Sequence, residues 1–416
     1  MKHRILLIGA SVRVGQLVRE VLRKYPEYEF VGVLDSDAPK AQDFMAYHGL
    51  SLPVFGAQDF ELALQSVQPD MAVITTSDYT HADYIVRCLD RKVSCLVEKP
   101  LCINAEQCRA IWEAQQRNPE VYAVTMHNSR YHRIVRKTRE LIQSGAIGEI
   151  RSIRYDEKLD HFHGSSYYRR WNRHKAYSGG LQIHKSCHHF DKINFLLGVR
   201  PAWVAASGCQ TAYGPSVHKS PARRCCECPE ADSCEFFLDY HKNPVYEKLY
   251  GVSTHAYTPD LCVYSEEADA EDFLGIFVMY SNGIPMNYSL SACCAYEGES
   301  IVFEGTTGRL EMSRLDYRRP ESRGGDAVSM RKENTLRIVR FATPEVENYD
   351  GEDDNKNASH GGCDELIYKD LFAGGKSEML ATLQDGIYAV LVGAAANVSI
   401  AQAGRKVEIA SLFTEG

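Results

Sequence analysis

The chain has 416 residues, of which 44% are hydrophobic and 25% charged, and a formal net charge of −8 at pH 7. This length accommodates about two or three domains, each with its own core. The negative charge disfavours non-specific binding to nucleic acid or to an anionic membrane, and no uninterrupted apolar run approaches a membrane span. The first apolar run is too short for a secretory signal, so we expect a cytoplasmic protein whose fourteen cysteines are mostly reduced.

The first third of the chain has the pattern of a dinucleotide-binding unit. Residues 5–8 are a buried-strand run that ends in the loop 9–15, and residues 16–24 follow as an amphipathic helix. A second apolar strand, 30–34, ends at Asp35. A glycine motif is credible as a dinucleotide site when it follows a strand and opens a helix, and when the next strand ends in an acidic residue. This part of the chain has that order of elements. An ordinary βαβ unit without nucleotide is the alternative.

The loop departs from the G-x-G-x-x-G pattern, because Ser11 and Val14 stand at the second and third glycine positions. Amides at the start of the helix can still bind a pyrophosphate. Asp35 suits the ribose hydroxyls of NAD and repels the 2′-phosphate of NADP, so NAD is expected and NADP is disfavoured. The residues expected at the cofactor are Gly9, Ser11, Val12, Arg13, Val14, Asp35, Thr75, Thr76, Ser77, His81, Glu98, Lys99 and Asn128.

The alternation of strands and helices continues to a strand at 93–97, which ends at Glu98-Lys99-Pro100. Open parallel sheets bind their ligands at the carboxyl ends of the strands. A lysine at that edge could donate to a substrate oxygen and depress the pKa of an attacked hydroxyl. A solvated lysine at a strand end is the alternative interpretation.

A second cluster of titratable side chains lies in residues 179–198. A Gly-Gly pair opens this segment, and the spacing of its apolar residues predicts one continuous helix. In such a helix His184 and His188 lie one turn apart on one face, with Lys185 in a neighbouring stripe. Histidine titrates near physiological pH, so these rings are candidates for exchanging a substrate proton. A structural role for any single histidine is the alternative.

In this order and spacing the motifs resemble those of the Gfo/Idh/MocA oxidoreductases over nearly the whole chain. The motifs are Gly9-x-Ser11-x-Arg13, Asp35, Thr76-Ser77-Asp78-x-x-His81, Glu98-Lys99-Pro100 and Gly179-Gly180-x3-His184-x3-His188. The resemblance implies an α/β fold with a Rossmann domain, placed at 1–126, and a C-terminal α/β domain with a large open, mostly antiparallel sheet, placed at 127–416. The active site would lie between the two domains.

By that resemblance Lys99 matches the catalytic lysine and His188 the catalytic histidine. His184 stands where many members carry Asp, which leaves open whether His188 acts alone or in a relay with His184. This helix variant resembles a subgroup that acts on glycosides and modified sugars. The residues expected at the substrate are Lys99, Arg130, Tyr131, His163, Arg170, Trp171, His184, Lys185 and His188.

Three further segments allow predictions of structure or of substrate binding. Residues 161–174 are rich in aromatic, arginine and histidine side chains, which suit the apolar face and the hydroxyls of a sugar, with a structural loop as the alternative. Residues 124–131 are expected as a sixth strand that, by the resemblance, brings Asn128, Arg130 and Tyr131 to the cleft. Residues 318–331 are polar and charged, which is typical of a surface loop.

An insertion near 218–241 contains Cys225-x2-Cys228-x5-Cys234. Three thiolates could hold a structural zinc ion, with His218 or His241 as the fourth ligand. A redox dithiol is a second reading, and a cysteine-bearing insertion without metal is slightly favoured over both. No metal is expected at the active site, because the hydride chemistry of the resembled family does not generally need one.

The sequence thus predicts an NAD-dependent oxidoreductase that transfers hydride between nicotinamide and a secondary hydroxyl or ketone of a sugar, glycoside or modified sugar. Two alternatives remain open. One is a transient oxidation and elimination that cleaves or rearranges a glycosidic or anhydro bond without net redox change. The other is a sensor that binds NAD or sugar without chemistry. A homo-oligomer is expected by the resemblance, and neither nucleic acid nor a membrane is an expected partner.

Overall fold

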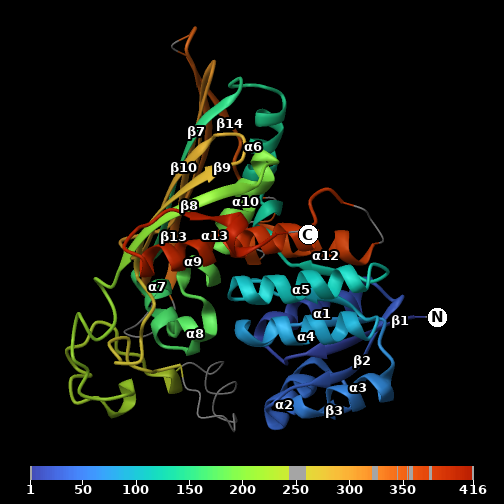
Figure 1. The fold of residues 1–416 in the computed structure, drawn as a ribbon. Helices are drawn as coiled ribbons and strands as arrows, with labels where there is room; N and C mark the ends of the chain where they lie inside the picture. Colours follow the sequence, from blue (N-terminus) through green and yellow to red (C-terminus); the bar gives the residue numbers. More distant parts are fainter. Residues whose placement is uncertain are drawn as a thin grey trace.

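The computed structural model describes residues 2–242, 259–320, 327–343, 345–353, 355, 359–373 and 377–414. The described chain forms two domains, each built on one sheet (Figure 1). The first sheet has the strand order β3-β2-β1-β4-β5-β6, and all its neighbouring strands are parallel. The second has the order β14-β13-β12-β11-β7-β10-β9-β8-β15, in which only β7 and β10 pair in parallel. The predicted fold, a Rossmann domain followed by an α/β domain with a mostly antiparallel sheet, is confirmed.

The Rossmann domain follows the predicted alternation of strands and helices. Its strands β1, β4 and β5 are nearly continuous runs of buried residues, as expected for a parallel sheet that helices cover on both faces. The strands are β1 (His3–Ile8), β2 (Tyr28–Leu34), β3 (Val54–Phe55), β4 (Met71–Ile74), β5 (Ser94–Val97) and β6 (Ala123–Thr125). The helices are α1 (Val12–Lys24), α2 (Ala38–His48), η1 (Ala57–Asp59), α3 (Phe60–Val67), α4 (Asp78–Asp90) and α5 (Ala105–Arg117).

The second domain places one face of its sheet against helices. In β9 buried residues alternate with more exposed ones, which is the pattern of a sheet covered on one side. Its strands are β7 (Ile150–Asp160), β8 (Pro201–Cys209), β9 (Phe273–Tyr280), β10 (Pro285–Cys294), β11 (Glu297–Gly305), β12 (Gly308–Pro320), β13 (Ala327–Arg340), β14 (Val346–Tyr349) and β15 (Val407–Glu408).

The remaining helices connect the domains or cover the second sheet. They are η2 (Asn128–Tyr131), α6 (Arg133–Gln143), α7 (His161–Tyr168), η3 (Trp171–Arg173), α8 (Lys175–Ser178), α9 (Leu181–His184), α10 (Cys187–Leu197), η4 (Cys225–Glu227), η5 (Tyr240–Lys242), η6 (Ser359–Gly362), α12 (Cys363–Phe372), α13 (Leu383–Ala401) and α14 (Ile409–Leu412). Helix α13 runs along the junction, beside α5 of the Rossmann domain and beneath β8 (Figure 1).

By length and composition α13 is the one helix of the described chain that could span a membrane. Two thirds of its apolar window, 67%, is buried inside the protein, and it packs against β8, α10 and α9. A helix that is apolar all round and enclosed by protein is a core helix. Its apolar character is therefore explained by its position at the domain junction.

The predicted continuous helix over 179–198 is wrong, because the structure breaks it into α9 and α10. The break lies at Ser186, whose amide donates to the Leu181 carbonyl over 2.9 Å and whose hydroxyl donates to the same carbonyl over 3.1 Å. Serine competes in this way with regular helical hydrogen bonding. His184 therefore ends one short helix and His188 begins the next, so the two rings do not share one regular helix face.

Two other predicted segments differ from the structure. The strand predicted over 124–131 ends at Thr125, and the 3₁₀ helix η2 follows it. The surface loop predicted over 318–331 is wrong at both ends, because these ends belong to the paired strands β12 and β13; residues 321–326 lie outside the described residues. Cross-strand pairs stabilise this polar hairpin, as where Arg331 lies 4.3 Å from the Tyr317 ring centroid. Buried apolar alternation marks only the other end of this hairpin, at Leu310 and Met312 of β12 and at Leu336 and Ile338 of β13.

Helix α13 approaches α9 closely at Gly393. A Cβ atom there would collide with the Gln182 carbonyl oxygen and would lie 2.6 Å from Cγ1 of Ile183. We expect Gly393→Ala to lower the free energy of unfolding by about 1–3 kcal/mol, because overpacking outweighs the higher helix propensity of alanine. Urea denaturation measures this. Gly275→Ala is the matched control, since a Cβ there has no neighbour within 4 Å; equal effects of the two variants would contradict the expectation.

Candidate active site

Lys99 and His184 meet where the two domains face each other. Lys99 follows β5 of the Rossmann sheet, and His184 ends α9 of the second domain. The Lys99 ammonium donates to the His184 carbonyl oxygen over 3.3 Å. From the Rossmann side, Asp78 at the start of α4 reaches the His184 ring, with Oδ2 lying 2.5 Å from Nδ1. The carboxyl ends of parallel strands thus face α9 and α10, as expected for a ligand site in an open sheet.

At the cofactor end, Asp35 holds the loop after β1. One of its oxygens accepts the Ala10 amide over 2.7 Å and the other accepts the Asp37 amide over 2.9 Å. A carboxylate has about four lone-pair sites, so both oxygens can also accept ribose hydroxyls. The Lys40 ammonium lies 3.5 Å from Asp35 Oδ2, and it offsets part of the carboxylate charge.

The loop itself is closed by short side chains. Ser11 caps α1 by accepting the Val14 amide over 3.3 Å, and its hydroxyl donates to Thr75 over 3.1 Å. Thr75 in turn donates to the Gly9 carbonyl over 2.7 Å. Gly9 has φ +95°, and a Cβ there would lie 2.9 Å from the Thr75 backbone, so only glycine fits this approach. Val12 and Arg13 form the first turn of α1.

The expected cofactor residues at the ends of β4 and β5 are largely engaged within the protein. His81 is buried between the carbonyl oxygens of Pro100 (2.8 Å) and Thr76 (3.1 Å). Glu98 is buried and accepts the Lys99 amide over 3.2 Å, and Ser77 precedes α4 as its cap residue. These contacts fix the backbone of both strand ends. A helix start beside hydroxyls, with a carboxylate at the next strand, fits the pyrophosphate and ribose of a dinucleotide.

The second catalytic candidate, His188, lies at the start of α10. Its Nδ1 is buried and has no hydrogen-bond partner among the described residues. Both ring nitrogens of the neighbouring His127 are also buried without a hydrogen-bond partner in the described chain, although Nε2 lies 4.0 Å from the Asp191 carboxylate, and the two ring centroids lie 5.6 Å apart. Buried polar atoms normally have a partner. Unsatisfied imidazole nitrogens at a domain junction therefore fit a site that a polar ligand completes.

Burial and nearby cations keep both catalytic imidazoles neutral. Burial, then the positive charge of Lys99, holds the pKa of His188 well below its ordinary value. Burial also lowers the pKa of His184, because it and the charge of Lys99 outweigh the opposing Asp78 carboxylate. Lys185 differs, since its ammonium lies 3.5 Å from the Glu157 carboxylate and its pKa is raised despite burial. At neutral pH the site thus combines neutral imidazoles with positively charged lysines.

Two aromatic rings from the segment 161–174 lie beside His184. The rings of Tyr167 and Trp171 lie 5.5 Å and 5.8 Å from the His184 ring, both edge-on. His163 is one step further away: its Nε2 lies 2.9 Å from the Tyr167 hydroxyl and its Nδ1 lies 2.6 Å from Glu297. Arg170 is close enough to His184 to lower the pKa of its ring. The structure therefore gathers these predicted substrate residues around one catalytic candidate.

Three residues expected in the cleft have partners inside the protein. The Arg130 guanidinium, 1% exposed, binds both oxygens of Asp191 at 2.6 and 2.7 Å. The Tyr131 hydroxyl donates to Asp370 over 2.8 Å, and Asn128 donates to Asp364 over 2.7 Å. These side chains tie the connector after β6 to α10 and α12. With η2 in place of the predicted strand, all three side chains have carboxylate partners in the second domain.

Sequence reasoning missed Asp78, Tyr167 and Asn172 as site residues. Asp78 lay within a motif already quoted, but its partner is 106 positions away in the chain. Asn172 places Nδ2 3.4 Å from Nε2 of His184. Tyr167 was counted within an aromatic segment without being singled out. Asp78 could have been found from its position. It is the acidic residue directly after a strand end rich in threonine and serine, and such strand ends carry ligand-facing groups in parallel sheets.

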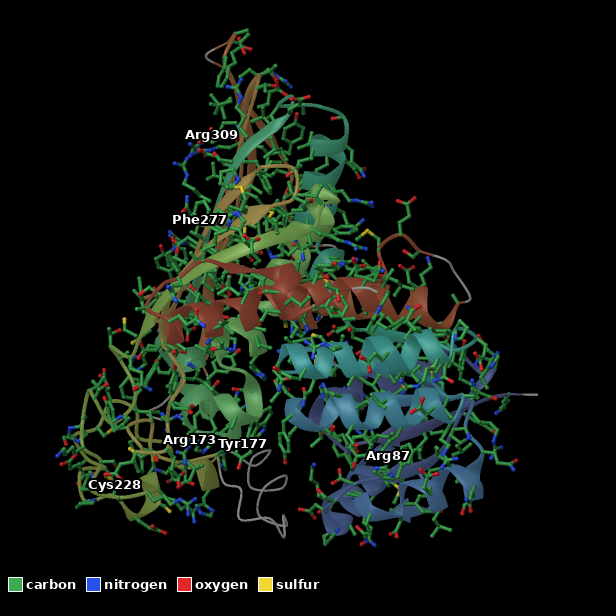
Figure 2. All side chains as sticks on the ribbon, viewed as in Figure 1. Arg87, Arg173, Tyr177, Cys228, Phe277 and Arg309 are labelled. Carbon is green, nitrogen blue, oxygen red and sulfur yellow. The ribbon has the colours of Figure 1, made fainter. Side chains whose placement is uncertain are left out.

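The cysteine insertion lies apart from this site. Figure 2 shows Cys228 at the outer edge of the second domain, on the side away from the Rossmann domain. Within the described ranges no group of three or more His, Cys, Asp or Glu side chains is arranged to hold a metal ion. Residue His218 pairs with Glu230, with Nε2 and Oε2 3.0 Å apart. The structure therefore gives no support to a zinc ion at Cys225, Cys228 and Cys234.

The fold and site define a two-domain oxidoreductase with a dinucleotide-binding Rossmann domain. Family models agree with this class: residues 3–126 match the oxidoreductase family's NAD-binding Rossmann fold, and residues 139–409 match its C-terminal alpha/beta domain. The chain belongs to the Gfo/Idh/MocA oxidoreductase family, whose members include dehydrogenases that act on CH–OH groups.

Relatives extend over most of the chain. The oxidoreductase YteT of Bacillus subtilis (strain 168) is 30% identical over 419 residues, covering 94% of each chain. Inositol 2-dehydrogenase of Rhizobium meliloti (strain 1021) is 26% identical over 207 residues, covering 50% of this chain and 58% of its own. The structure of a levoglucosan dehydrogenase, a complex with NADH and levoglucosan, matches with TM-score 0.65 and 15% identity over 98% of this chain and all of its own.

The burial of Arg130 makes a testable distinction between a structural and a substrate-binding role. We expect Arg130→Met to lower the free energy of unfolding by about 3–5 kcal/mol, because the buried Asp191 carboxylate loses its partner. Urea denaturation measures the loss. Arg133→Met is the control, since Arg133 and its partner Asp350 are both exposed and such pairs contribute about 0–1 kcal/mol. A raised KM with unchanged stability would instead place Arg130 at the substrate.

Proposed function

We propose that this oxidoreductase uses NAD to oxidise a secondary hydroxyl of a sugar, inositol or glycoside, or to reduce the corresponding ketone. The observation that carries the proposal is the meeting of Lys99 with two neutral histidines, His184 and His188, at the carboxyl ends of the Rossmann strands. Removing a hydride from an alcohol carbon also requires removal of the hydroxyl proton. A neutral imidazole accepts that proton, and an ammonium stabilises the developing negative charge on oxygen.

The chain's own groups fit these roles. The nicotinamide, when bound, supplies the acceptor for the hydride. His188 accepts the hydroxyl proton, because its unsatisfied nitrogen and its lowered pKa leave it neutral and available. The Lys99 ammonium stabilises the alkoxide that forms. Its hydrogen bond to the His184 carbonyl fixes the ammonium at the domain junction, so substrate and cofactor are held between the two domains.

The choice of NAD rests on Asp35. Its carboxylate is buried at the end of β2, where the adenosine ribose lies in dinucleotide-binding folds. A 2′-phosphate would meet this negative charge directly. Lys40 lies beside Asp35 and weakens the discrimination, so we expect a preference for NAD and not an absolute requirement. The Rossmann domain matches a family described as NAD-binding.

The substrate class is supported by the aromatic rings and by the relatives. Tyr167 and Trp171 offer ring surfaces beside His184, which suit the apolar face of a sugar ring. Relatives are named for inositol and, among solved structures, for levoglucosan. We also propose that the protein works in the cytoplasm as a homo-oligomer with no nucleic-acid or membrane partner.

The deciding experiment offers the protein NAD with a panel of inositols, aldoses and glycosides and follows absorbance at the NADH band, with mass analysis of the products. A rising signal with a keto product, lost in Lys99→Met, is the expected result. A flat signal with an altered sugar indicates transient oxidation and elimination without net redox change. A flat signal with unaltered substrates across the panel, despite measurable NAD binding, contradicts the enzymatic proposal and favours a sensor.

The lowered pKa of His188 sets the acid side of the pH profile. Below its pKa the ring is protonated and cannot accept a proton, so alcohol oxidation fails as pH falls through that value. Because burial places this pKa well below its ordinary value, we expect kcat/KM to remain level down past about pH 6.5. A pH profile of kcat/KM for oxidation measures this. An acid limb centred at or above that pH would show that His188 is not the buried neutral base.

A further inference from the structure

Asp78 makes a contact across the domains that no sequence motif revealed. It is the first residue of α4, directly after the strand end Thr75–Ser77 that lines the expected cofactor site. Its side chain is 4% exposed, and its Oδ2 lies 2.5 Å from Nδ1 of His184. A buried carboxylate needs a donor at such a distance. The His184 ring supplies that donor from the other domain.

This contact fixes the position of the proton on His184. A carboxylate oxygen only accepts hydrogen bonds, so Nδ1 of the ring carries the hydrogen. In the neutral ring Nε2 is then left unprotonated and can only accept. The other neighbour agrees with this arrangement, because the Asn172 amide nitrogen, a donor, lies 3.4 Å from Nε2. Both sides of the ring therefore specify one tautomer.

The groups that face His184 come from four places in the chain. Asp78 approaches from α4 and Lys99 from the end of β5, while Arg170 precedes η3. Tyr167 of α7 and Trp171 of η3 place their rings edge-on at 5.5 Å and 5.8 Å. The cations and burial oppose the carboxylate, and the net pKa of His184 is lowered. The ring is thus neutral at pH 7 and keeps an acceptor nitrogen among the predicted substrate residues.

We propose that Asp78 is a positioning residue, which holds His184 as the Nδ1–H tautomer so that Nε2 can exchange its long 3.4 Å hydrogen bond from Asn172 for one from a substrate hydroxyl. The role resembles that of an aspartate behind a general-base histidine, which orients the ring and stabilises its protonated form. It also links the two domains, because the carboxylate belongs to the cofactor-binding domain and the ring to the substrate domain. The hydrogen bond from a substrate hydroxyl to Nε2 rests on the proposed function, whereas the tautomer of His184 does not.

The tautomer is tested first, without turnover. The protein is labelled with ¹⁵N-histidine, and the ring signals of His184 are identified as those missing in His184→Gln. We expect a protonated, pyrrole-type Nδ1 and an unprotonated, pyridine-type Nε2 at pH 7. The opposite assignment, or signals averaged between both tautomers, would overturn the inference and leave the dehydrogenase proposal standing. The same signals in Asp78→Asn are expected to lose this preference, because the charged acceptor is gone.

The kinetic test compares two acidic residues of the same helix. We expect Asp78→Asn to lower kcat by about a hundredfold, at the low end of acid–base contributions, while KM for NAD changes little. Asp78→Glu is expected to recover part of the loss. Asp83→Asn is the matched control, because Asp83 is exposed and pairs with Arg87 on the surface of α4. Equal effects at both positions, or a kcat within twofold of the original protein, would overturn the positioning role.

Discussion

A buried ion pair between Arg130 and Asp191 anchors α10, the helix that carries the candidate residue His188. The guanidinium belongs to the connector after β6, and the carboxylate lies on α10, three residues beyond His188. Asp385 at the start of α13 is a second acceptor, 3.3 Å from the same guanidinium. A buried carboxylate without its partner is strongly destabilising. Arg130 therefore links the connector after β6 both to α10, which carries His188, and to the start of α13.

Burial at the domain junction also lowers the pKa values of the two candidate histidines. An imidazole that is removed from water and placed near cations remains neutral at lower pH than usual. This direction holds for both His188 and His184, because burial and the charge of Lys99 lower the pKa of each ring. The same low-dielectric setting strengthens the Asp78–His184 contact. Under the proposed function, proton acceptance and charge stabilisation both arise from where the two domains meet.

Several features could be predicted from the sequence because they are local. Buried parallel strands read as continuous apolar runs, so the Rossmann order, Asp35 and the strand-end Lys99 were recognisable. Other features were hidden because their signal is absent from single segments. The outer half of the β12–β13 hairpin does not continue the buried apolar alternation of its base, and the break before α10 depends on a serine hydroxyl that competes with helical hydrogen bonding.

The sequence by itself determined the Rossmann order and drew attention to Lys99 and the histidines, through strand-end position and spacing, and its resemblance to a known family implied the two-domain fold and the roles of Lys99 and His188. Only the tertiary structure decided what those residues contact. Arg130, Tyr131 and Asn128 turned out to be paired inside the protein, and Asp78 proved to be the partner of His184. The reason is physical: each contact joins residues about 60 or more positions apart, and no local pattern encodes such a distance.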